Sequence, residues 1–160
     1  MFSDLYAAAE ATYAAGASAT PVRFLSRFDK SATNIKDSQL FISIGQVPWA
    51  TAYSTWYHQY VAFPIQALTA AITLRGYTIT DRGTWLSLPP NITEDATIYK
   101  AGSDDESDLL LNPAHLLIGN KAQDLKLAQS FADWLISDQG GQKVIRGFKK
   151  EGQVLYSTAP

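Results

Sequence analysis

The sequence predicts an α/β fold, in which helices alternate with short strands. Two observations support this class. Several segments repeat apolar residues every three or four positions, as an amphipathic helix does, and short runs with β-branched residues lie between them. The chain has 160 residues, of which 46% are hydrophobic and 18% charged, so it can bury a core of its own. A chain of this length fits one domain.

The first expected elements are a helix, a strand and a second helix. Apolar residues at helical spacing predict a helix from Phe2 to Ala15. Val22 to Ser26 is a short strand candidate. Ser31 can open the next helix, which runs on to Ile44 and is ended by Gly45. The strand is therefore expected to lead through a short loop into a helix start.

An aromatic segment and a third helix come next. The segment from Trp49 to Tyr60 is rich in aromatic residues, and we expect its second half to be helical. The proline before Ile65 suits the first turn of a helix that runs to Arg75. From Tyr77 to Leu88 a short strand is expected to enter a corner, where Thr80 or Asp81 can cap a short helix.

Further short strands are expected after this corner. Residues 89–91 and 102–108 are predicted to be loops on either side of a strand from Thr97 to Ala101. The apolar runs from Leu109 to Leu111 and from Leu116 to Ile118 flank a proline. We expect these runs to be buried strands, or a strand pair that the proline interrupts.

The chain is expected to end in two helices and a strand. Apolar residues on one face predict a helix from Leu125 to Ile136. The Ser137–Asp138 pair can cap a last helix, which passes through Phe148 and ends near Gly152. A short strand from Val154 to Tyr156 follows. Helices and short strands thus alternate along the whole sequence.

The composition excludes several classes of protein. A formal net charge of −2 provides no bulk positive field for nucleic acid, and no apolar run reaches the roughly 18 residues that span a bilayer. Without cysteine, neither disulfides nor thiolate metal sites can form. Asp4 and Glu10 interrupt the N-terminal segment, so no signal peptide is expected and the compartment stays open. Asn91 begins a glycosylation sequon, which matters only if the protein is secreted.

No pattern in the sequence indicates an enzyme, a metal site or a cofactor. His58 and His115 are isolated, with no second histidine three or four residues away. The acidic residues within 104–108 lack the alternating ligands and the glycine of a calcium-binding loop, so a solvated loop is expected. No Ser-His-Asp order, phosphate-binding loop or dinucleotide glycine pattern occurs. We therefore expect a non-enzymatic protein.

The best candidates for a binding site lie between the first strand and the second helix: Ser26, Arg27, Ser31 and Thr33. Free N–H groups at a helix start favour an anion, and Arg27 can add a bidentate fork to a tetrahedral oxyanion. The alternative from the residues alone is structural, with Ser31 only a helix cap and Arg27 paired with Asp29 at the surface. Both interpretations stay open at this point.

Three segments carry a further signal: FLSRFDKSATNIKDSQL from Phe24, YTITDRGTWLSL from Tyr77 and FADWLISDQGGQKVIRGFKKEGQVLY from Phe131. In order and spacing they resemble segments of the tungstate-binding proteins, which are the substrate-binding components of bacterial tungstate and molybdate importers, with relatives in fungi. The resemblance covers most of the chain and implies the type II periplasmic-binding fold, whose two lobes hold the anion between them.

The resemblance also implies how the chain divides. Residues 1–112 resemble the second lobe of that fold, a small mixed sheet flanked by helices. Residues 113–160 resemble the C-terminal segment that returns to the first lobe in the family. Because the resemblance starts near the first helix of the second lobe, we expect the N-terminal part of the first lobe to be absent.

The family segment S-R-G-D-x-S-G-T-H implies which residues contact the oxyanion. Its arginine and hydroxyl residues correspond here to the four candidates Ser26, Arg27, Ser31 and Thr33. This sequence departs from the family elsewhere. The two glycines are Phe28 and Ala32 here, and the histidine is Asn34. A glycine-rich family loop is replaced by Val61 to Pro64, which hinders close backbone approach to a ligand.

We therefore expect a non-enzymatic solute-binding module for tungstate or molybdate, with binding weakened or lost. The alternative is an interaction scaffold that has kept the fold without the ligand, and that dimerises or binds a protein partner through the face left by the missing lobe. Such a scaffold would form a homodimer or exchange segments between copies, because large apolar patches are rarely left in water. Family relatives are periplasmic or extracellular, while this sequence alone leaves the compartment unknown.

Overall fold

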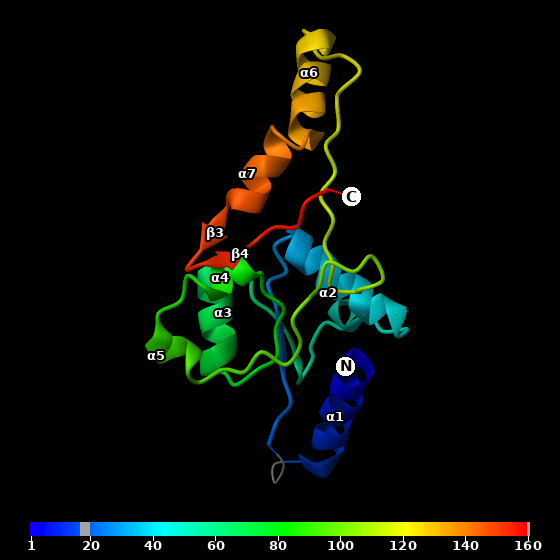
Figure 1. Ribbon diagram of the computed structural model, residues 1–160. Helices are drawn as coiled ribbons and strands as arrows, with labels where there is room; N and C mark the ends of the chain where they lie inside the picture. Colours follow the sequence, from blue (N-terminus) through cyan, green and yellow to red (C-terminus); the bar gives the residue numbers. More distant parts are fainter. Residues whose placement is uncertain (17–19, 160) are drawn as a thin grey trace. The chain divides into compact units, whose positions relative to one another are not determined.

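The computed structural model describes residues 1–16 and 20–159 (Figure 1). The chain divides into two compact units, Met1–Ser103 and Asp104–Pro160. The α/β class expected from the sequence is confirmed: two short strands alternate with the first three helices, and two more short strands follow the last helix of the described chain. The division into residues 1–112 and 113–160 stays a prediction.

The first unit contains a short parallel sheet with helices around it. Its elements are α1 (Phe2–Ala15), β1 (Phe24–Ser26), α2 (Ala32–Ser43), the 3-10 turn η2 (Pro48–Ala50), β2 (Tyr57–Gln59), α3 (Pro64–Thr73), α4 (Arg82–Trp85) and α5 (Pro90–Thr93). The predicted first helix is confirmed residue for residue, and the second and third begin and end within two residues of expectation.

β1 is the centre of this sheet. It pairs in parallel with β2, with Phe24 opposite Tyr57 and Ser26 opposite Gln59. On its other side Leu25 N donates to Tyr77 O at 2.8 Å, and Phe24 forms a parallel bridge with Tyr77. Three chain segments thus run in the same direction, and the two connections between them are made by α2 and α3.

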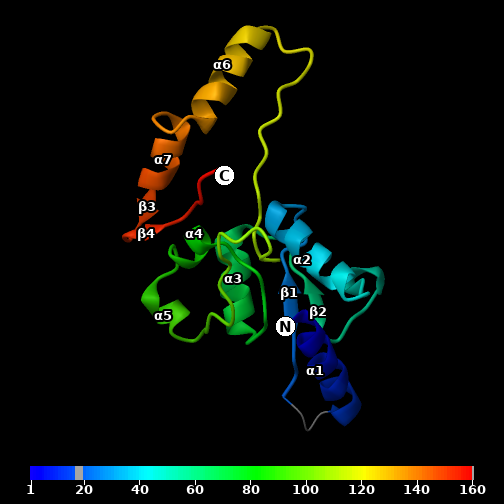
Figure 2. The ribbon, with the colours of Figure 1, turned by 45° about the vertical axis from the view of Figure 1, so that its right-hand side comes forward.

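The two faces of β1 pack against different helices. Phe24 is buried among the aromatic rings of Phe2, Phe41 and Tyr57, at centroid distances between 5.1 and 5.9 Å. Leu25, one residue on, points to the opposite face and packs against α3, where small alanines allow close approach. Figure 2 shows α2 and α3 on opposite sides of β1. Neighbouring residues of one buried strand therefore contact the two sides of the core.

The second half of the aromatic segment is a strand, so the expectation of a helix there was wrong. Trp56 O accepts from Phe24 N at 2.7 Å, and Tyr60 N donates to Ser26 O at 2.9 Å. Trp56 and Tyr57 are both buried. Pairing with β1 buries these rings on an extended backbone, which suits aromatic side chains better than the helix does.

The second unit contains α6 (Leu125–Ile136), α7 (Gly141–Gly147), β3 (Lys149–Lys150) and β4 (Gln153–Val154). The helix from Leu125 to Ile136 is confirmed, and Asp124 caps it by accepting from Leu127 N at 2.8 Å. A Cβ on Gly141 would lie 2.5 Å from Leu135 O, so the close α6–α7 turn excludes a side chain there. β3 and β4 pair antiparallel.

Several smaller expectations were wrong. The runs Leu109–Leu111 and Leu116–Ile118 are not strands, and Leu117 is 87% exposed. Thr97 to Ala101 is not a strand either. These segments have high strand propensity, but within residues 1–16 and 20–159 no neighbouring strand pairs with them.

The remaining differences concern boundaries and sheet arrangement. The expected loop at residues 89–91 enters helix α5, and α7 is preceded by Gly140 rather than capped by Ser137–Asp138. The one small mixed sheet that we expected is instead two separate pairs of strands, one parallel and one antiparallel. None of the helices in the described residues has both the length and the apolar character needed to cross a membrane.

Candidate functional site

The polar loops of the first unit gather at the carboxyl end of its parallel sheet. β1 leads into α2 on one face, and β2 leads into α3 on the opposite face. In open parallel sheets, ligands bind at the carboxyl ends of the strands, where successive connections leave on opposite faces. The loops after β1, β2 and Tyr77 share this edge, so a ligand-binding site is expected there.

Arg27 lies at this edge, directly after β1, and its side chain is only 10% exposed. Its Nη2 atom lies 2.5 Å from Asp29 Oδ2, so the ion pair proposed as the structural alternative does form. The pair is largely buried, however, rather than lying at the surface. Burial opposes ionisation of Asp29, but hydrogen bonds from Ser31 and Arg27 outweigh this and hold the pKa of Asp29 below its usual value. The buried Nε atom of Arg27 has no partner among the described residues.

Ser26 is fully buried and its hydroxyl is engaged by the chain itself. Its O–H donates to Asp37 Oδ2 at 2.8 Å. Its oxygen accepts from Phe28 N at 3.3 Å and from Asn34 Nδ2 at 3.2 Å. A hydroxyl has one donor and two acceptor positions, so these three bonds use its full capacity. Ser26 therefore supports the loop in this conformation.

Ser31 and Thr33 lie at the start of α2. Ser31 is the N-cap, as expected, and its Oγ accepts from Asn34 N at 3.4 Å. Thr33 is half-buried in the first turn. The first N–H groups of a helix have no partner within the helix, and the helix dipole places partial positive charge there. The structure thus brings three of the predicted residues, Arg27, Ser31 and Thr33, to one loop and helix start.

The loop backbone adopts an unusual conformation at two positions. Phe28 has φ of 45° and Lys30 has φ of 62°, both in the left-handed region that glycine enters most easily. In the resemblance described above, Phe28 corresponds to the first glycine of the segment S-R-G-D. The loop therefore adopts a backbone shape suited to glycine while carrying a large aromatic side chain, at an energetic cost.

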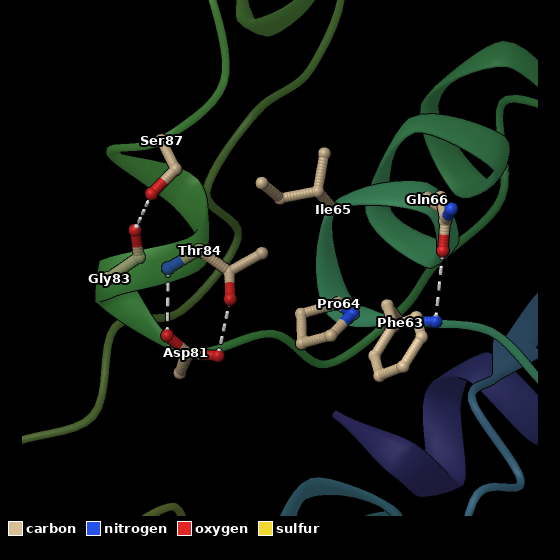
Figure 3. Close-up of a pocket in the computed structure, with 8 residues that line it drawn as sticks. All are labelled: Phe63, Pro64, Ile65, Gln66, Asp81, Gly83, Thr84 and Ser87. Atoms are coloured by element: carbon tan, nitrogen blue, oxygen red, sulfur yellow. Dashed lines mark hydrogen bonds between the residues drawn. The ribbon is translucent and has the colours of Figure 1, made fainter.

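A hollow of about 560 Å³ lies beside this edge, between the start of α3 and α4. Figure 3 shows Phe63 to Gln66 on one side of it, and Asp81, Gly83, Thr84 and Ser87 on the other. The polar groups of the second wall bond one another: Asp81 accepts from Thr84 N at 2.7 Å and from Thr84 Oγ1 at 2.6 Å. The first wall presents Phe63 and Pro64, in the segment that the resemblance sets against a glycine-rich family loop.

The other residues considered from the sequence are spread over the chain. His58 lies on β2, where burial and then the charge of Arg23 lower its pKa. Asn91 is exposed on α5. In the described part of the chain, no group of three or more histidine and acidic residues could hold a metal ion.

Two residues beneath the candidate loop were not among the candidates from the sequence, although Asn34 was noted at the position of the family's histidine. Asn34 and Asp37 are buried beneath the loop, with Asp37 only 2% exposed. Burial raises the pKa of Asp37 to about 6, against hydrogen bonds from Ser26, Asn34 and Ser38 that lower it. The sequence does contain a pattern that indicates their burial. Residues 34, 37 and 41 share one face of a helix, and Phe41 belongs to the core. Polar residues on an apolar face indicate a buried polar network.

The parallel strands and the helices that connect them define an α/β domain whose polar loops lie at the carboxyl edge of the sheet. Residues 2–139 match the PBP superfamily domain, and the chain belongs to that superfamily. The crystal structure of a periplasmic protein provisionally named as metal binding shares this fold with a TM-score of 0.89 and 64% identity. That match covers 99% of this chain and 75% of the other. The periplasmic-binding-type α/β fold expected from the resemblance is confirmed.

Two curated relatives agree with the family predicted from the three sequence segments. A provisionally named ABC transporter anion-binding protein of Haloferax volcanii is 30% identical over 83% of this chain. The tungstate-binding protein TupA of Campylobacter jejuni is 28% identical over 72% of this chain. The chain spans 38% and 43% of the lengths of these two relatives. The resemblance to anion-binding proteins, including a tungstate-binding one, is thereby confirmed.

Proposed function

We propose that this chain is a non-enzymatic solute-binding module for a tetrahedral oxyanion of the tungstate and molybdate class. The anion binds at the loop between β1 and α2. The single observation that carries this proposal is Arg27: its side chain is nine-tenths buried, and its Nε atom has no partner among the described residues. A buried guanidinium N–H without a partner is costly, and an anion oxygen would remove the cost.

The donors around Arg27 suit an oxyanion. Ser31 and Thr33 carry hydroxyls at the start of α2. Ser31 Oγ already accepts from Asn34 N, which leaves the N–H groups of Ala32 and Thr33 without a partner inside the helix. α2 has 12 residues, long enough for its dipole to favour an anion at this end. In this proposal Arg27, Ser31 and Thr33 contact the anion, and Ser26 holds the loop that carries them.

Two features of the loop weaken binding. Asp29 already neutralises part of the Arg27 charge, and its lowered pKa keeps it ionised at neutral pH. Phe28 places a ring next to Arg27 in the sequence, where the family has glycine. The relatives named for anion and tungstate binding support the ligand class, and these departures lead us to expect an affinity below that of a complete family site.

A thermal melt with and without millimolar tungstate or molybdate tests the proposal, with sulfate and phosphate as controls. A micromolar site would be stabilised by about 4 kcal/mol at a thousandfold excess of ligand, which raises Tm by about ten degrees for a chain of this size. A shift with tungstate and molybdate alone supports the proposal. The absence of any shift contradicts it.

The second candidate function is the interaction scaffold, and one observation in the second unit favours it. α6 has a clearly amphipathic sequence, yet none of its residues is buried. Phe131 and Trp134 stack on each other with centroids 5.9 Å apart and remain about half exposed. Sedimentation analysis over a range of concentrations tests whether copies of the chain associate. A monomer at every concentration contradicts the homodimer and the segment exchange.

A further inference from the structure

We propose that Asp37 is a positioning residue of the oxyanion site, which holds the loop from Arg27 to Ser31 in its binding conformation through Ser26 and Asn34. This inference rests on the proposed function and deepens it. Asp37 lies in the second turn of α2, beneath the loop, and touches none of the groups that would contact the anion directly.

The connection from Asp37 to the loop follows two branches. In the first, Asp37 Oδ2 accepts from Ser26 Oγ at 2.8 Å, and Ser26 Oγ accepts from Phe28 N at 3.3 Å. In the second, Asp37 Oδ1 lies 3.4 Å from Asn34 Nδ2, and Asn34 Oδ1 accepts from Lys30 N at 3.0 Å. Asp37 therefore orients the two side chains that fix the loop backbone.

The two loop residues held in this way are the two with left-handed backbone, Phe28 and Lys30. Such conformations persist for non-glycine residues only where the surroundings enforce them. The hydrogen bonds to Phe28 N and Lys30 N enforce them here, and Asp37 sets the orientation of both acceptors. Loss of this support would let the loop relax and move Arg27, which lies next to Phe28.

The charge of Asp37 is not explained by an ion pair. In the described chain no cation forms an ion pair with it, although its burial makes ionisation costly. The titratable groups that act on it are Asp29 from the loop and Tyr57 from β2. Asp29 raises the pKa of Asp37, while burial and then the Asp37 charge keep the Tyr57 phenol protonated, with a pKa of about 12.

The hydrogen bonds around Asp37 require an ionised carboxylate, which accepts hydrogen bonds but donates none. Ser26 gives its hydrogen to Asp37, which leaves both of its acceptor positions for Phe28 N and Asn34 Nδ2. An asparagine at position 37 would direct its NH₂ group at either Ser26 or Asn34 and disturb one branch. Protonation of Asp37 has the same effect, because the carboxyl group gains a donor.

The variants Asp37→Asn and Ser38→Ala separate this role from a general structural one. Ser38 Oγ also donates to Asp37 Oδ1, at 3.3 Å, but makes no bond to the loop, so Ser38→Ala is the matched control. The first measurement is calorimetric titration of the full chain with molybdate between about pH 8 and about pH 5, a range that includes the raised pKa of Asp37. The second is hydrogen exchange of the Phe28 and Lys30 amides without anion.

We expect wild-type affinity to fall about tenfold as the pH decreases through this range, the effect of losing a hydrogen bond to a charged group. Asp37→Asn should bind weakly at every pH, and Ser38→Ala should follow the wild type. Protonation of molybdate itself affects binding to both proteins equally, so the Asp37→Asn profile serves as the correction for it. Wild-type affinity in Asp37→Asn, or parallel pH profiles of the two proteins, would overturn the proposal.

The hydrogen-exchange measurement distinguishes failure of the proposed oxyanion binding from failure of the positioning role of Asp37. If the wild type binds no oxyanion at any pH, the proposed function fails, but the positioning role is still tested by the free protein. We expect the Phe28 and Lys30 amides to be protected in wild type and Ser38→Ala and to lose protection in Asp37→Asn. Unchanged protection would refute the role of Asp37. If Asp37→Asn does not fold, the exchange of the wild type across the same pH range provides the same test.

Discussion

Both carboxylate oxygens of Asp81 are held by one residue, Thr84. Thr84 N donates to Oδ1 at 2.7 Å, and the Thr84 hydroxyl donates to Oδ2 at 2.6 Å. Asp81 is thereby the N-cap of α4, one of the two caps expected at this corner from the sequence alone. Because α4 is only four residues long, its own hydrogen bonds contribute little and the cap largely maintains it.

Replacing Asp81 by alanine should lower the free energy of unfolding by about 1–2 kcal/mol, the cost of losing an N-cap. Urea denaturation measures the change. Asp81→Asn is the control, since asparagine caps as well as aspartate does and should remain close to wild type. If both variants lose the same stability, the charge of Asp81 rather than its capping bonds is responsible.

Phe41 should be the most sensitive position of the first unit. It is fully buried, and its ring contacts those of Phe2, Phe24, Trp56 and Tyr57. Phe41→Ala should lower the unfolding free energy by about 3–5 kcal/mol. Ile42→Ala, at a neighbouring position that is 57% exposed, is the matched control and should change it by less than about 1 kcal/mol.

The stability of the protein should decrease as the pH rises from 3.8 to about 6, because of Asp37. The folded state holds the Asp37 proton up to about pH 6, whereas the unfolded chain releases it near 3.8, so unfolding releases a proton between these values. The contribution amounts to about 3 kcal/mol. Asp29 acts oppositely at lower pH: its pKa is lowered, so its stabilisation is lost as the pH falls below 3.8.

Urea unfolding of wild type and Asp37→Asn across this range checks the Asp37 contribution. The difference in unfolding free energy between the two proteins should change with pH in the window above 3.8, because only the wild type titrates there at position 37. Parallel stability curves would show that Asp37 titrates normally in the folded protein.

Phe28→Gly should bind molybdate several-fold more tightly than wild type. Glycine adopts the left-handed backbone of this position without strain, and it removes the ring next to Arg27. Lys30→Gly is the matched control, because it relieves a similar backbone conformation and leaves the ring in place. Tighter binding of Phe28→Gly alone assigns the weakness of the site to the ring, and tighter binding of both assigns it to backbone strain.

Much of the fold can be predicted because its helices carry local signals. The helix from Phe2 to Ala15, the cap at Ser31 and the helix from Leu125 to Ile136 are all confirmed. The strand β2 could not be predicted locally, because pairing with β1 determines the backbone of Tyr57. Leu109–Leu111 shows the converse, since strand propensity alone does not form a strand without a partner.

The sequence indicates which candidate residues come together in one loop, but not how their side chains are arranged. A strand end followed by a helix cap predicts where Arg27, Ser31 and Thr33 come together, and the structure brings them to one loop. That Ser26 gives its hydroxyl to a buried Asp37 depends on the helix lying against the strand, at a separation of 11 residues. Spacing alone could indicate only that polar residues share the core face of α2.

Calorimetric titration of molybdate into wild type, Arg27→Ala and Arg23→Ala tests the central claim most directly. Arg23 precedes β1 at the end of the strand opposite Arg27, so it controls for loss of one positive charge. The proposed function predicts measurable binding in wild type and Arg23→Ala, and none in Arg27→Ala. Equal affinity in all three proteins, or binding by none of them, would contradict an oxyanion site built on Arg27.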